Sequence, residues 1–547
     1  MKKNAFHALS FSVIMAVLNA FSLPSSATNK IENIDSIIDC MSLFNQHIIQ
    51  TYESPEPLPI AILNEQCNSE IVGLKKYINS RSDESQNFDD SLSLQVYLDN
   101  SLTLKEKALV YSQSIDFLNQ QIARRNPSVN LNLDFSLYSL NYLRCTTNAY
   151  ALVGTVCSEV KDFEPYSKPQ NYYQFGSTNS PNISLSYDLF NREKDMSIMS
   201  AKSNSNAQSS LLNNEFQDFS QKTLKKLDEI SKAQQKVIIR KSSEMLYRKS
   251  LEIAENQLEI GFQTTVGVDK LKSSLAKAES QLINSVSDLQ KKLSDFSTFT
   301  SSNKVQLENL SFISNKFSDL PIENPDSMIQ SAIETNPKFQ QIKYQLDQIG
   351  YQILAKKAKK YPTLSLSLGV GLEKTGIVYD SMLKTNSVSS QFTGTLGIRW
   401  DLYDSGLTKS LVGSEKKKLE KSKIQLEQLT LSTTNEIQSL VSQIRASNLE
   451  LKERINAVKS SESAMRGTHA RMLAGFEDTT SLIQTVEQYI TDQGQLVDSV
   501  YEGSDLYRQL AFISQNLSAF NTDGDIQKSF EKQKLNANSL NYSFTLN

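Results

Sequence analysis

The chain has 547 residues, a formal net charge of −3 and a mean hydropathy of −0.38. This balance excludes a nucleic-acid binder, which would carry a basic excess on one face. A hydrophobic content of 39% is low for a compact globule of this length, so it favours thin, elongated helical packing.

Residues 1–27 have the pattern of a signal peptide. Lys2 and Lys3 precede an apolar run that ends at about Ala20, and Ser25-Ser26-Ala27 supplies a small-x-Ala cleavage pattern. We therefore expect an exported protein. Because no Cys follows the cleavage site, we expect no lipid anchor on the new N-terminus. No later segment approaches ~20 consecutive apolar residues, so any crossing of a membrane must use strands.

A unit that occurs twice dominates the rest of the chain. Each copy has a helix with a basic end, a proline, two strands of alternating apolar and polar residues, and a very long helix that turns back at Gly-Phe. The first copy predicts a helix at 92–125, strands at 128–137 and 182–189, and helices at 193–259 and 268–299 on either side of Gly261-Phe262. The second predicts a helix at 327–360, strands at 364–372 and 392–402, and helices at 407–474 and 482–517 on either side of Gly475-Phe476. Such self-similarity indicates one architecture built from two equivalent units.

The four strand runs are about ten residues long, which is the length of a tilted transmembrane strand. Taken alone, each run fits a half-buried strand of a soluble sandwich better. Four matched runs with aromatic residues at one end favour the membrane, where aromatic side chains gather at the interface. These aromatic residues are Tyr187, Phe190, Trp400 and Tyr403.

The two long helices are predicted to be equal in length. Leu189 and Leu402 are 213 positions apart, and Gly261 and Gly475 are 214 apart. A helix of ~67 residues would be ~100 Å long, too long for burial in an ordinary domain. The first strand pair has a loop 22 residues longer than its counterpart, and loops that vary in length usually end in solvent.

The domain organisation follows from the repeat. We expect a signal peptide at 1–27, an N-terminal periplasmic segment at 28–91, a first repeat at 92–300, a linker at 301–326, a second repeat at 327–520 and a polar C-terminal tail at 521–547.

Four amphipathic strands cannot cross a bilayer alone, because lipid offers no partner to the backbone groups of the two edge strands. Closure needs at least about eight strands, so other copies of the same chain must complete the barrel. If the helices continue the strand walls, the product is a conduit that requires no catalysis.

The chain resembles the TolC-like outer-membrane efflux protein family over residues 92–520. The shared pattern is the duplicated basic-x-Pro start of the strands, the closing Asp-Leu-(Phe/Tyr)-(Asn/Asp) before a long helix, and the Gly turns GFQTTVGVDKL and GFEDTTSLIQT. The resemblance implies an α+β membrane protein: a homotrimer with a 12-strand β-barrel in the outer membrane, four strands from each chain, continued by a periplasmic α-helical coiled-coil barrel. It also implies contact with outer-membrane lipid. A periplasmic adaptor and an inner-membrane pump would dock at the tips, at Gly261, Phe262, Gly475 and Phe476.

The resemblance further implies a periplasmic entrance ringed by acidic residues. The positions where many members carry them hold Ser481 and Gln484 here, and the nearby acids are Glu477, Asp478, Glu487 and Asp269. Like charges around a threefold axis would favour cations and resist closure. The alternative for each acid is an ordinary solvated charge.

The four cysteines fit export. If the strands cross a membrane, Cys40 and Cys67 lie on one side of it, and Cys145 and Cys157, inside the first strand-pair loop, lie on the other. The reachable disulfides are then Cys40 with Cys67 and Cys145 with Cys157. The alternative is four unpaired thiols.

An enzyme is the first rival class, and the sequence offers it no catalytic motif, cofactor or metal site. His47 and His469 lack metal-ligand spacing and are expected to face solvent. The second rival is a periplasmic coiled-coil adaptor or a surface structural protein, which explains the helices but not the matched strands. For a channel, the cargo is either small molecules driven by a proton-coupled pump or a polypeptide exported by an ABC-type pump.

Overall fold

The computed structural model describes residues 41–42, 94–144, 150–153, 156–159, 170–301, 324–379, 384–516 and 523–539. The chain divides into two compact units. Unit 1 consists of residues 1–108, 212–337 and 429–536, and unit 2 of residues 109–211, 338–428 and 537–547. Each repeat contributes to both units, so the compact units and the repeats are different divisions of the chain.

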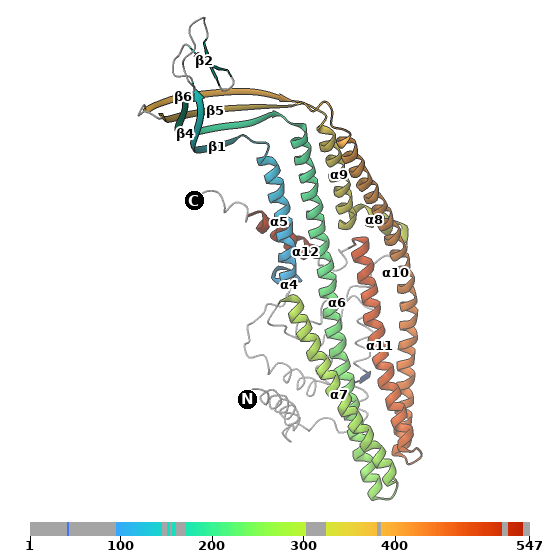
Figure 1. The fold of residues 1–547 in the computed structure, drawn as a ribbon. Helices are drawn as coiled ribbons and strands as arrows, with labels where there is room; N and C mark the ends of the chain where they lie inside the picture. The colour runs from blue at the N-terminus through green and yellow to red at the C-terminus, as the bar shows by residue number, and fades with distance from the viewer. Residues whose placement is uncertain are drawn as a thin grey trace, which may run out of the picture. The chain divides into compact units, whose positions relative to one another are not determined.

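Unit 2 contains a four-stranded antiparallel sheet in the order β1-β4-β5-β6 (Figure 1). The strands are β1 (Ser128–Arg144), β4 (Gln170–Phe190), β5 (Thr363–Tyr379) and β6 (Lys384–Arg399). β4 pairs with β5, so the two repeats share one ladder, and β1 and β6 remain as edges. A separate hairpin of β2 (Tyr150–Val153) and β3 (Val156–Glu159) lies within the long loop of the first repeat.

The strands are longer than the sequence predicted. β1 has 17 residues and β4 has 21, because the antiparallel ladder continues past the alternating runs as far as the pair of Arg144 and Gln170. The alternation itself separates two faces. One face exposes apolar side chains in neighbouring strands, and the other carries mainly Ser, Thr, Asn and Gly. The exposed apolar residues include Val129, Leu131, Leu133, Ile183, Val370, Phe392, Leu396 and Ile398.

The helix expected at 92–125 is interrupted. It consists of α4 (Leu94–Asn100) and α5 (Leu102–Ala123), with Ser101 between them. The Ser101 hydroxyl accepts a hydrogen bond from the amide of Leu104 at 3.3 Å, as a helix N-cap does. The helix expected at 327–360 is likewise two helices, α8 (Pro325–Thr335) and α9 (Pro337–Ala358). Asn336 adopts an extended ψ of 129° between them, because a residue before proline is excluded from the helical region.

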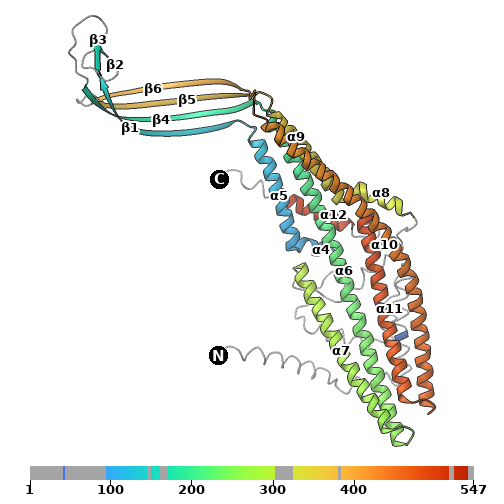
Figure 2. The same ribbon diagram turned by 45° about the vertical axis from the view of Figure 1, so that its right-hand side comes forward.

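The long helices are those that the sequence predicted. α6 (Arg192–Glu259) has 68 residues and α10 (Leu407–Leu473) has 67, whereas α7 (Thr265–Thr300) and α11 (Thr479–Ser514) have 36 each. The prediction of equal helical parts is confirmed. Figures 1 and 2 show α6 with α7 and α10 with α11 as two antiparallel hairpins.

Part of the core of unit 1 lies between these two hairpins. One apolar cluster takes side chains from all four helices, among them Leu246, Leu271, Ile455, Met465, Leu482 and Tyr489. α12 (Asp523–Ser539) lies within the predicted C-terminal tail. It packs Phe530 edge to face on Phe216 of α6 at 5.9 Å and pairs Lys532 with Asp99 of α4.

Two properties of the described residues bear on function. Within these ranges, none of the helices is long and apolar enough to cross a membrane. The same residues contain no group of three His, Cys, Asp or Glu side chains placed to hold a metal ion. The predicted disulfides lie outside the described residues. Cys40, Cys67 and Cys145 are not described, and of Cys157 only the backbone in β3 is described.

Candidate functional site at the helical tips

The two hairpins turn through the same backbone motif. At the end of α6, the amide of Phe262 donates to the carbonyl of Gln257 at 2.8 Å and the amide of Gly261 donates to that of Leu258 at 3.1 Å. At the end of α10, Phe476 and Gly475 make the equivalent bonds to Arg471 and Met472 at 2.9 and 3.0 Å. This is the Schellman arrangement, which needs a left-handed residue. The φ angles of +79° at Gly261 and +78° at Gly475 explain why glycine occupies both positions.

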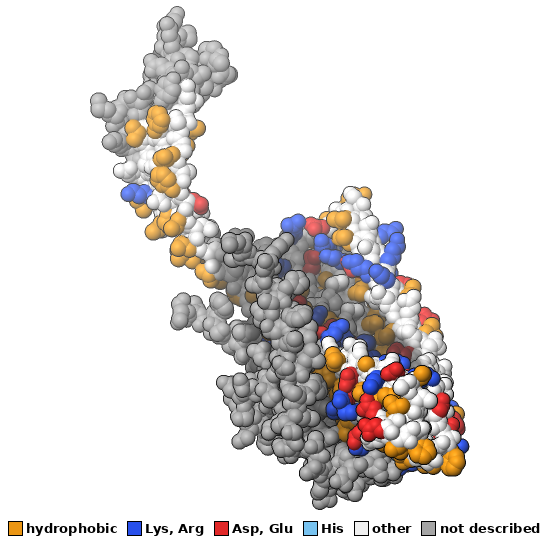
Figure 3. Space-filling model, turned by 90° about the horizontal axis from the view of Figure 1, so that it is seen from below, with side chains coloured by type: hydrophobic (Ala, Val, Ile, Leu, Met, Phe, Trp, Pro, Cys, Tyr) orange, Lys and Arg blue, Asp and Glu red, His pale blue; other side chains and the backbone are white. Residues whose placement is uncertain are grey.

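Each turn presents a phenylalanine to solvent. Phe262 is 75% exposed and Phe476 is 83% exposed. Ile260 and Val266 are also exposed beside the first turn, and Leu473 beside the second. Figure 3 views the molecule from below and shows mixed hydrophobic, acidic and basic side chains on the helical part that faces the viewer. Each tip therefore carries exposed apolar groups among charged side chains.

Asp478 caps a helix. Its carboxylate accepts hydrogen bonds from the amide of Ser481 at 2.9 Å and from the Ser481 hydroxyl at 3.0 Å, at the N-terminus of α11. The backbone hydrogen bond from Ser481 is the main cause that lowers the pKa of Asp478. Thr264 caps α7 in the same way, through the amide of Gly267 at 3.1 Å.

The two tips contact each other through α7 and α11. Lys277 of α7 pairs with Glu487 of α11 at 2.9 Å, and the Lys270 ammonium donates to the Thr480 hydroxyl at 2.9 Å. A Cβ on Gly267 would lie 2.9 Å from the Oγ1 of buried Thr479, so this glycine permits a close approach of the two helices. Its counterpart in the second repeat is Ser481, so the two tips are not interchangeable.

The four predicted entrance acids have different surroundings. Glu477 lies 3.5 Å from Arg471 within its own tip, Asp478 is the cap of α11, and Glu487 joins the hairpins through Lys277. Asp269 is exposed near the start of α7. The sequence did not single out Lys277, Lys270 or Gly267. Only the glycine gave a signal, because it is present in one tip motif and absent from the other.

Further contacts join the hairpins away from the tips. Arg508 of α11 is completely buried and pairs with Asp228 of α6, and it lies 3.3 Å from Asp505 on its own helix. Burial lowers the pKa of Arg508 to about 10, so the guanidinium remains charged at neutral pH. Asp498 of α11 receives Lys232 and Lys236 of α6 at 2.8 and 2.7 Å. The Tyr247 hydroxyl donates to the carbonyl of Ile483 at 3.4 Å.

His469 corrects one expectation. The sequence analysis placed it in solvent, but it is only 3% exposed, on the side of α10 that also buries Met465 and Met472. Residues four and three positions away along a helix lie on the same face, so His469 belongs to the core stripe of α10.

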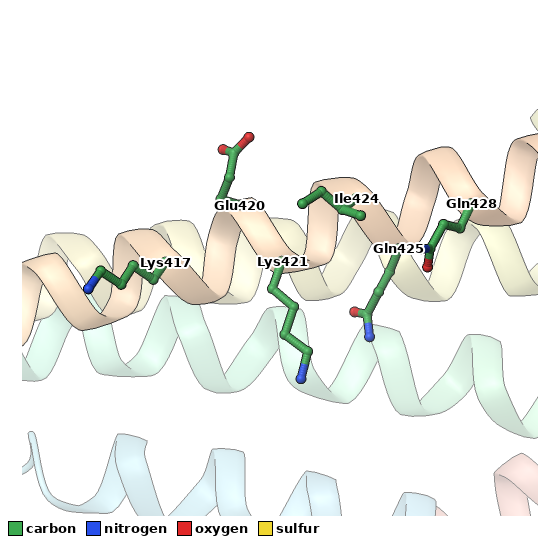
Figure 4. Close-up of a pocket in the computed structure, with 6 residues that line it drawn as sticks. All are labelled: Lys417, Glu420, Lys421, Ile424, Gln425 and Gln428. Carbon is green, nitrogen blue, oxygen red and sulfur yellow. The ribbon is translucent and has the colours of Figure 1, made fainter.

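A shallow groove on α10 belongs to unit 2. Its volume is about 480 Å³, and Lys417, Glu420, Lys421, Ile424, Gln425 and Gln428 line it. Figure 4 shows that all six come from one helix and that Glu420 points away from Lys421 and Gln425. The side chains do not converge on one point, so the groove has the character of an uncovered helix surface.

Comparison with known proteins gives one family match and several structural matches. Residues 328–513 match the family model described as outer membrane efflux protein. No curated protein matches the chain. Several solved structures share its fold. CusC is 15% identical, with a TM-score of 0.61 over 80% of this chain and 95% of its own. CmeC of Campylobacter jejuni is 14% identical (TM-score 0.58; 81% and 88%), and VceC of Vibrio cholerae is 15% identical (TM-score 0.56; 77% and 94%).

Proposed function

We propose that this chain, whose second repeat matches the outer membrane efflux protein model, is the exit duct of a tripartite export system. In this proposal it lies in the outer membrane, with its helical part in the periplasm, as its partial family match and its fold favour. In this proposal the duct is passive and trimeric. A periplasmic adaptor would connect it to an inner-membrane pump, either proton-coupled or of the ABC type, and the cargo would be small molecules or a secreted polypeptide. No catalytic chemistry is required.

The observation that carries the proposal is the four-stranded sheet with two unpaired edges and an exposed apolar face. An edge strand in lipid leaves its amide and carbonyl groups without partners, so the sheet must close on further strands. Three copies supply twelve strands, above the minimum of about eight for a closed barrel. β6 of one copy would pair with β1 of the next, and the mainly uncharged polar face would line the lumen.

The helical tips support docking of the adaptor. Phe262 and Phe476 are exposed on rigid turns, and exposed aromatic groups on a fixed backbone suit a protein interface. We assign docking to the turns at Gly261-Phe262 and Gly475-Phe476. Among the acids, Asp269 suits the charged entrance best, because Asp478 caps α11, Glu487 is held by Lys277 and Glu477 lies 3.5 Å from Arg471.

Fractionation and conductance test the channel. The protein is expected in the outer-membrane fraction, to migrate as a heat-sensitive trimer, and to conduct in planar bilayers. A soluble monomer without conductance would favour the alternative, a periplasmic coiled-coil adaptor or a surface structural protein.

Crosslinking tests the partners. A photocrosslinker attached to a Cys at Gln263 or Glu477, beside the tip turns, should capture a periplasmic adaptor, and the adaptor would identify the pump. The same probe at Leu449, an exposed position on α10 away from the turns, is the control.

A further inference from the structure

The groove on α10 follows a regular row of residues along that helix. Four of its lining residues, Lys417, Lys421, Ile424 and Gln428, succeed one another at steps of four, three and four positions. Steps that alternate between four and three keep side chains on one side of a helix, as the packed positions of a coiled coil are. All four side chains are exposed, Ile424 at 49%. We call these four residues the α10 stripe.

A matching row lies on α5 of the same compact unit. Its residues have the same steps of four, three and four positions and are all exposed. We call them the α5 stripe, and they are Leu109, Gln113, Asp116 and Gln120. Leu109 is 53% exposed, whereas Ala108 and Tyr111 are buried on the other side of the helix. The α5 stripe therefore faces away from the side on which α5 packs within its own chain.

The strands determine which helices meet where two copies join. In the proposed barrel, β6 of one copy pairs with β1 of the next. α5 ends at Ala123 and leads into β1 at Ser128, and β6 ends at Arg399 and leads into α10 at Leu407. Because consecutive elements of a chain are usually adjacent in space, this joint brings α10 of one copy beside α5 of the next. The two helices are antiparallel, since α5 runs toward the sheet and α10 runs away from it (Figure 2).

Counting from the sheet brings the two stripes to one level. Asp116 lies seven residues from the end of α5 that is nearest the sheet, and Lys417 lies ten residues from the corresponding end of α10. The difference of three residues is ~4.5 Å at ~1.5 Å per residue, which is less than one helical turn. Leu109 and Ile424 lie 14 and 17 residues from the same ends, so they differ by the same amount.

At this level the two stripes complement each other. The pairs are Lys417 with Asp116, Lys421 with Gln113, and Ile424 with Leu109. The numbers of the paired residues add to 533 or 534, and a nearly constant sum is what two antiparallel helices require. The described ion pairs beside the α10 stripe join Lys418 to Glu415 and Lys423 to Glu420. Among the described residues, the two lysines of the stripe therefore have no acidic partner within their own chain.

We propose that α5 of one copy fills the α10 groove of the next, with Leu109 packed on Ile424 and Asp116 beside Lys417. This inference rests on the proposed function, because it needs the trimeric barrel. A second copy of the chain is the occupant, because the joint of β6 and β1 carries its α5 to this place and its acid faces the lysines of the groove. The charges are exposed, so they fix the register of the two helices more than they strengthen the contact.

Disulfide formation tests the contact. Leu109→Cys and Ile424→Cys are placed in the same full-length chain, and the protein is oxidised in detergent. Electrophoresis without reductant should show most chains as covalent dimers and trimers, because the two Cβ atoms lie within reach of a disulfide. Each single variant controls for bonds to the four native cysteines. Leu109→Cys with Lys423→Cys is the matched control: Lys423 is exposed but lies ~100° around the helix from Ile424, so covalent trimer should fall several-fold.

Charge reversal tests the register. Asp116→Lys and Lys417→Asp should each lower the temperature at which the trimer dissociates in detergent by several degrees, and the two together should recover most of the loss. Asp116→Lys with Lys418→Asp, one position off the stripe, should recover none of it. A trimer that conducts but forms no disulfide between positions 109 and 424 overturns the inference, as does equal crosslinking at position 423 or a double reversal without recovery. A protein that neither forms trimers nor conducts contradicts the proposed function itself.

Discussion

Arg508 of α11 and Asp228 of α6 form an ion pair across the two helical hairpins, and the guanidinium has no exposed surface. A charge in such a position depends on its partner, because removing one member leaves the other buried and uncompensated. Substitutions in this pair therefore measure how much it contributes to holding the two hairpins together.

Arg508→Met should lower the free energy of unfolding by about 3–5 kcal/mol, because Asp228 then stays buried without its cation. Asp228→Leu combined with Arg508→Met should recover most of this loss. Urea unfolding of the detergent-solubilised protein, followed by circular dichroism, measures both. Lys225→Met is the matched control, since the Lys225–Asp505 pair joins the same helices at 3.0 Å but is partly exposed and should cost at most about 1 kcal/mol. Equal losses for the two single variants would contradict the assignment.

Gly261→Ala and Gly475→Ala should each destabilise the protein by about 1–2 kcal/mol. Nothing lies within 4 Å of an added Cβ at either site, so the cost comes from the positive φ alone. Gly467→Ala in α10 is the control. It also has open space but no positive φ, and it should stabilise by about 0.5–1 kcal/mol through helix propensity. The same sign for all three substitutions would refute the conformational explanation.

Asp478→Ala should remove about 1 kcal/mol by deleting the N-cap of α11, whereas Asp478→Asn should lose much less, because asparagine also caps. The pKa of Asp478 is lowered in the folded protein, so its contribution is present above the unfolded value of 3.8 and is lost as the pH falls further. The protection factor of the Ser481 amide against hydrogen exchange, measured relative to the intrinsic rate at each pH, should therefore fall in acid in the wild type but not in Asp478→Asn. Exchange with the same pH profile in both would show that the carboxylate is not the cap.

Breaking the Lys277–Glu487 pair should change conductance more than stability. Both side chains are largely exposed, so Lys277→Ala should cost at most about 0.5 kcal/mol. Because the pair joins α7 to α11, its loss should let the tips separate and raise the open probability in planar bilayers. Lys272→Ala breaks a similar pair with Glu255, at 3.2 Å, that lies within one hairpin. That variant should leave conductance unchanged, and if it opens the channel equally, a contact between hairpins is not the cause.

Phe262→Ala and Phe476→Ala should leave stability within about 0.5 kcal/mol, since both rings are exposed. Each should reduce crosslinking to the adaptor several-fold, because a buried aromatic group at an interface typically contributes about 2 kcal/mol or more. Leu449→Ala, at a position on α10 that is 65% exposed, is the control for a general loss of apolar surface. Undiminished crosslinking in the double variant would move the docking site away from the turns.

The fold could be predicted well because its signals are local. Strict alternation sets the faces of the strands, and Gly-Phe after a long helix predicts the left-handed turns at Gly261 and Gly475. The break at Asn336 was also readable, since a proline follows it. It was missed because the apolar pattern continues across it. His469 was misplaced although it falls on the same helical stripe as Met465 and Met472.

The tip contacts could not be predicted in the same way. Lys277 and Glu487 are 210 positions apart, and nothing near either residue in the sequence identifies its partner. Their contact depends on how the two hairpins pack. That packing is set by the many apolar side chains buried together in the core cluster. The late start of α10 could not be predicted for a related reason. Residues 400–406 align with the first repeat, and only the loss of strand pairing after Arg399 distinguishes them.

The β4–β5 ladder joins the two repeats within one chain. In the proposed trimer, a ring of six repeats would have three such joints inside chains and three between chains, at β6 and β1. Gene duplication would thus have placed half of these joints inside single chains. It would also have allowed the two repeats to differ, as Gly267 differs from Ser481. A ring of identical halves would be sixfold, whereas this chain can specialise alternate positions around the same circumference.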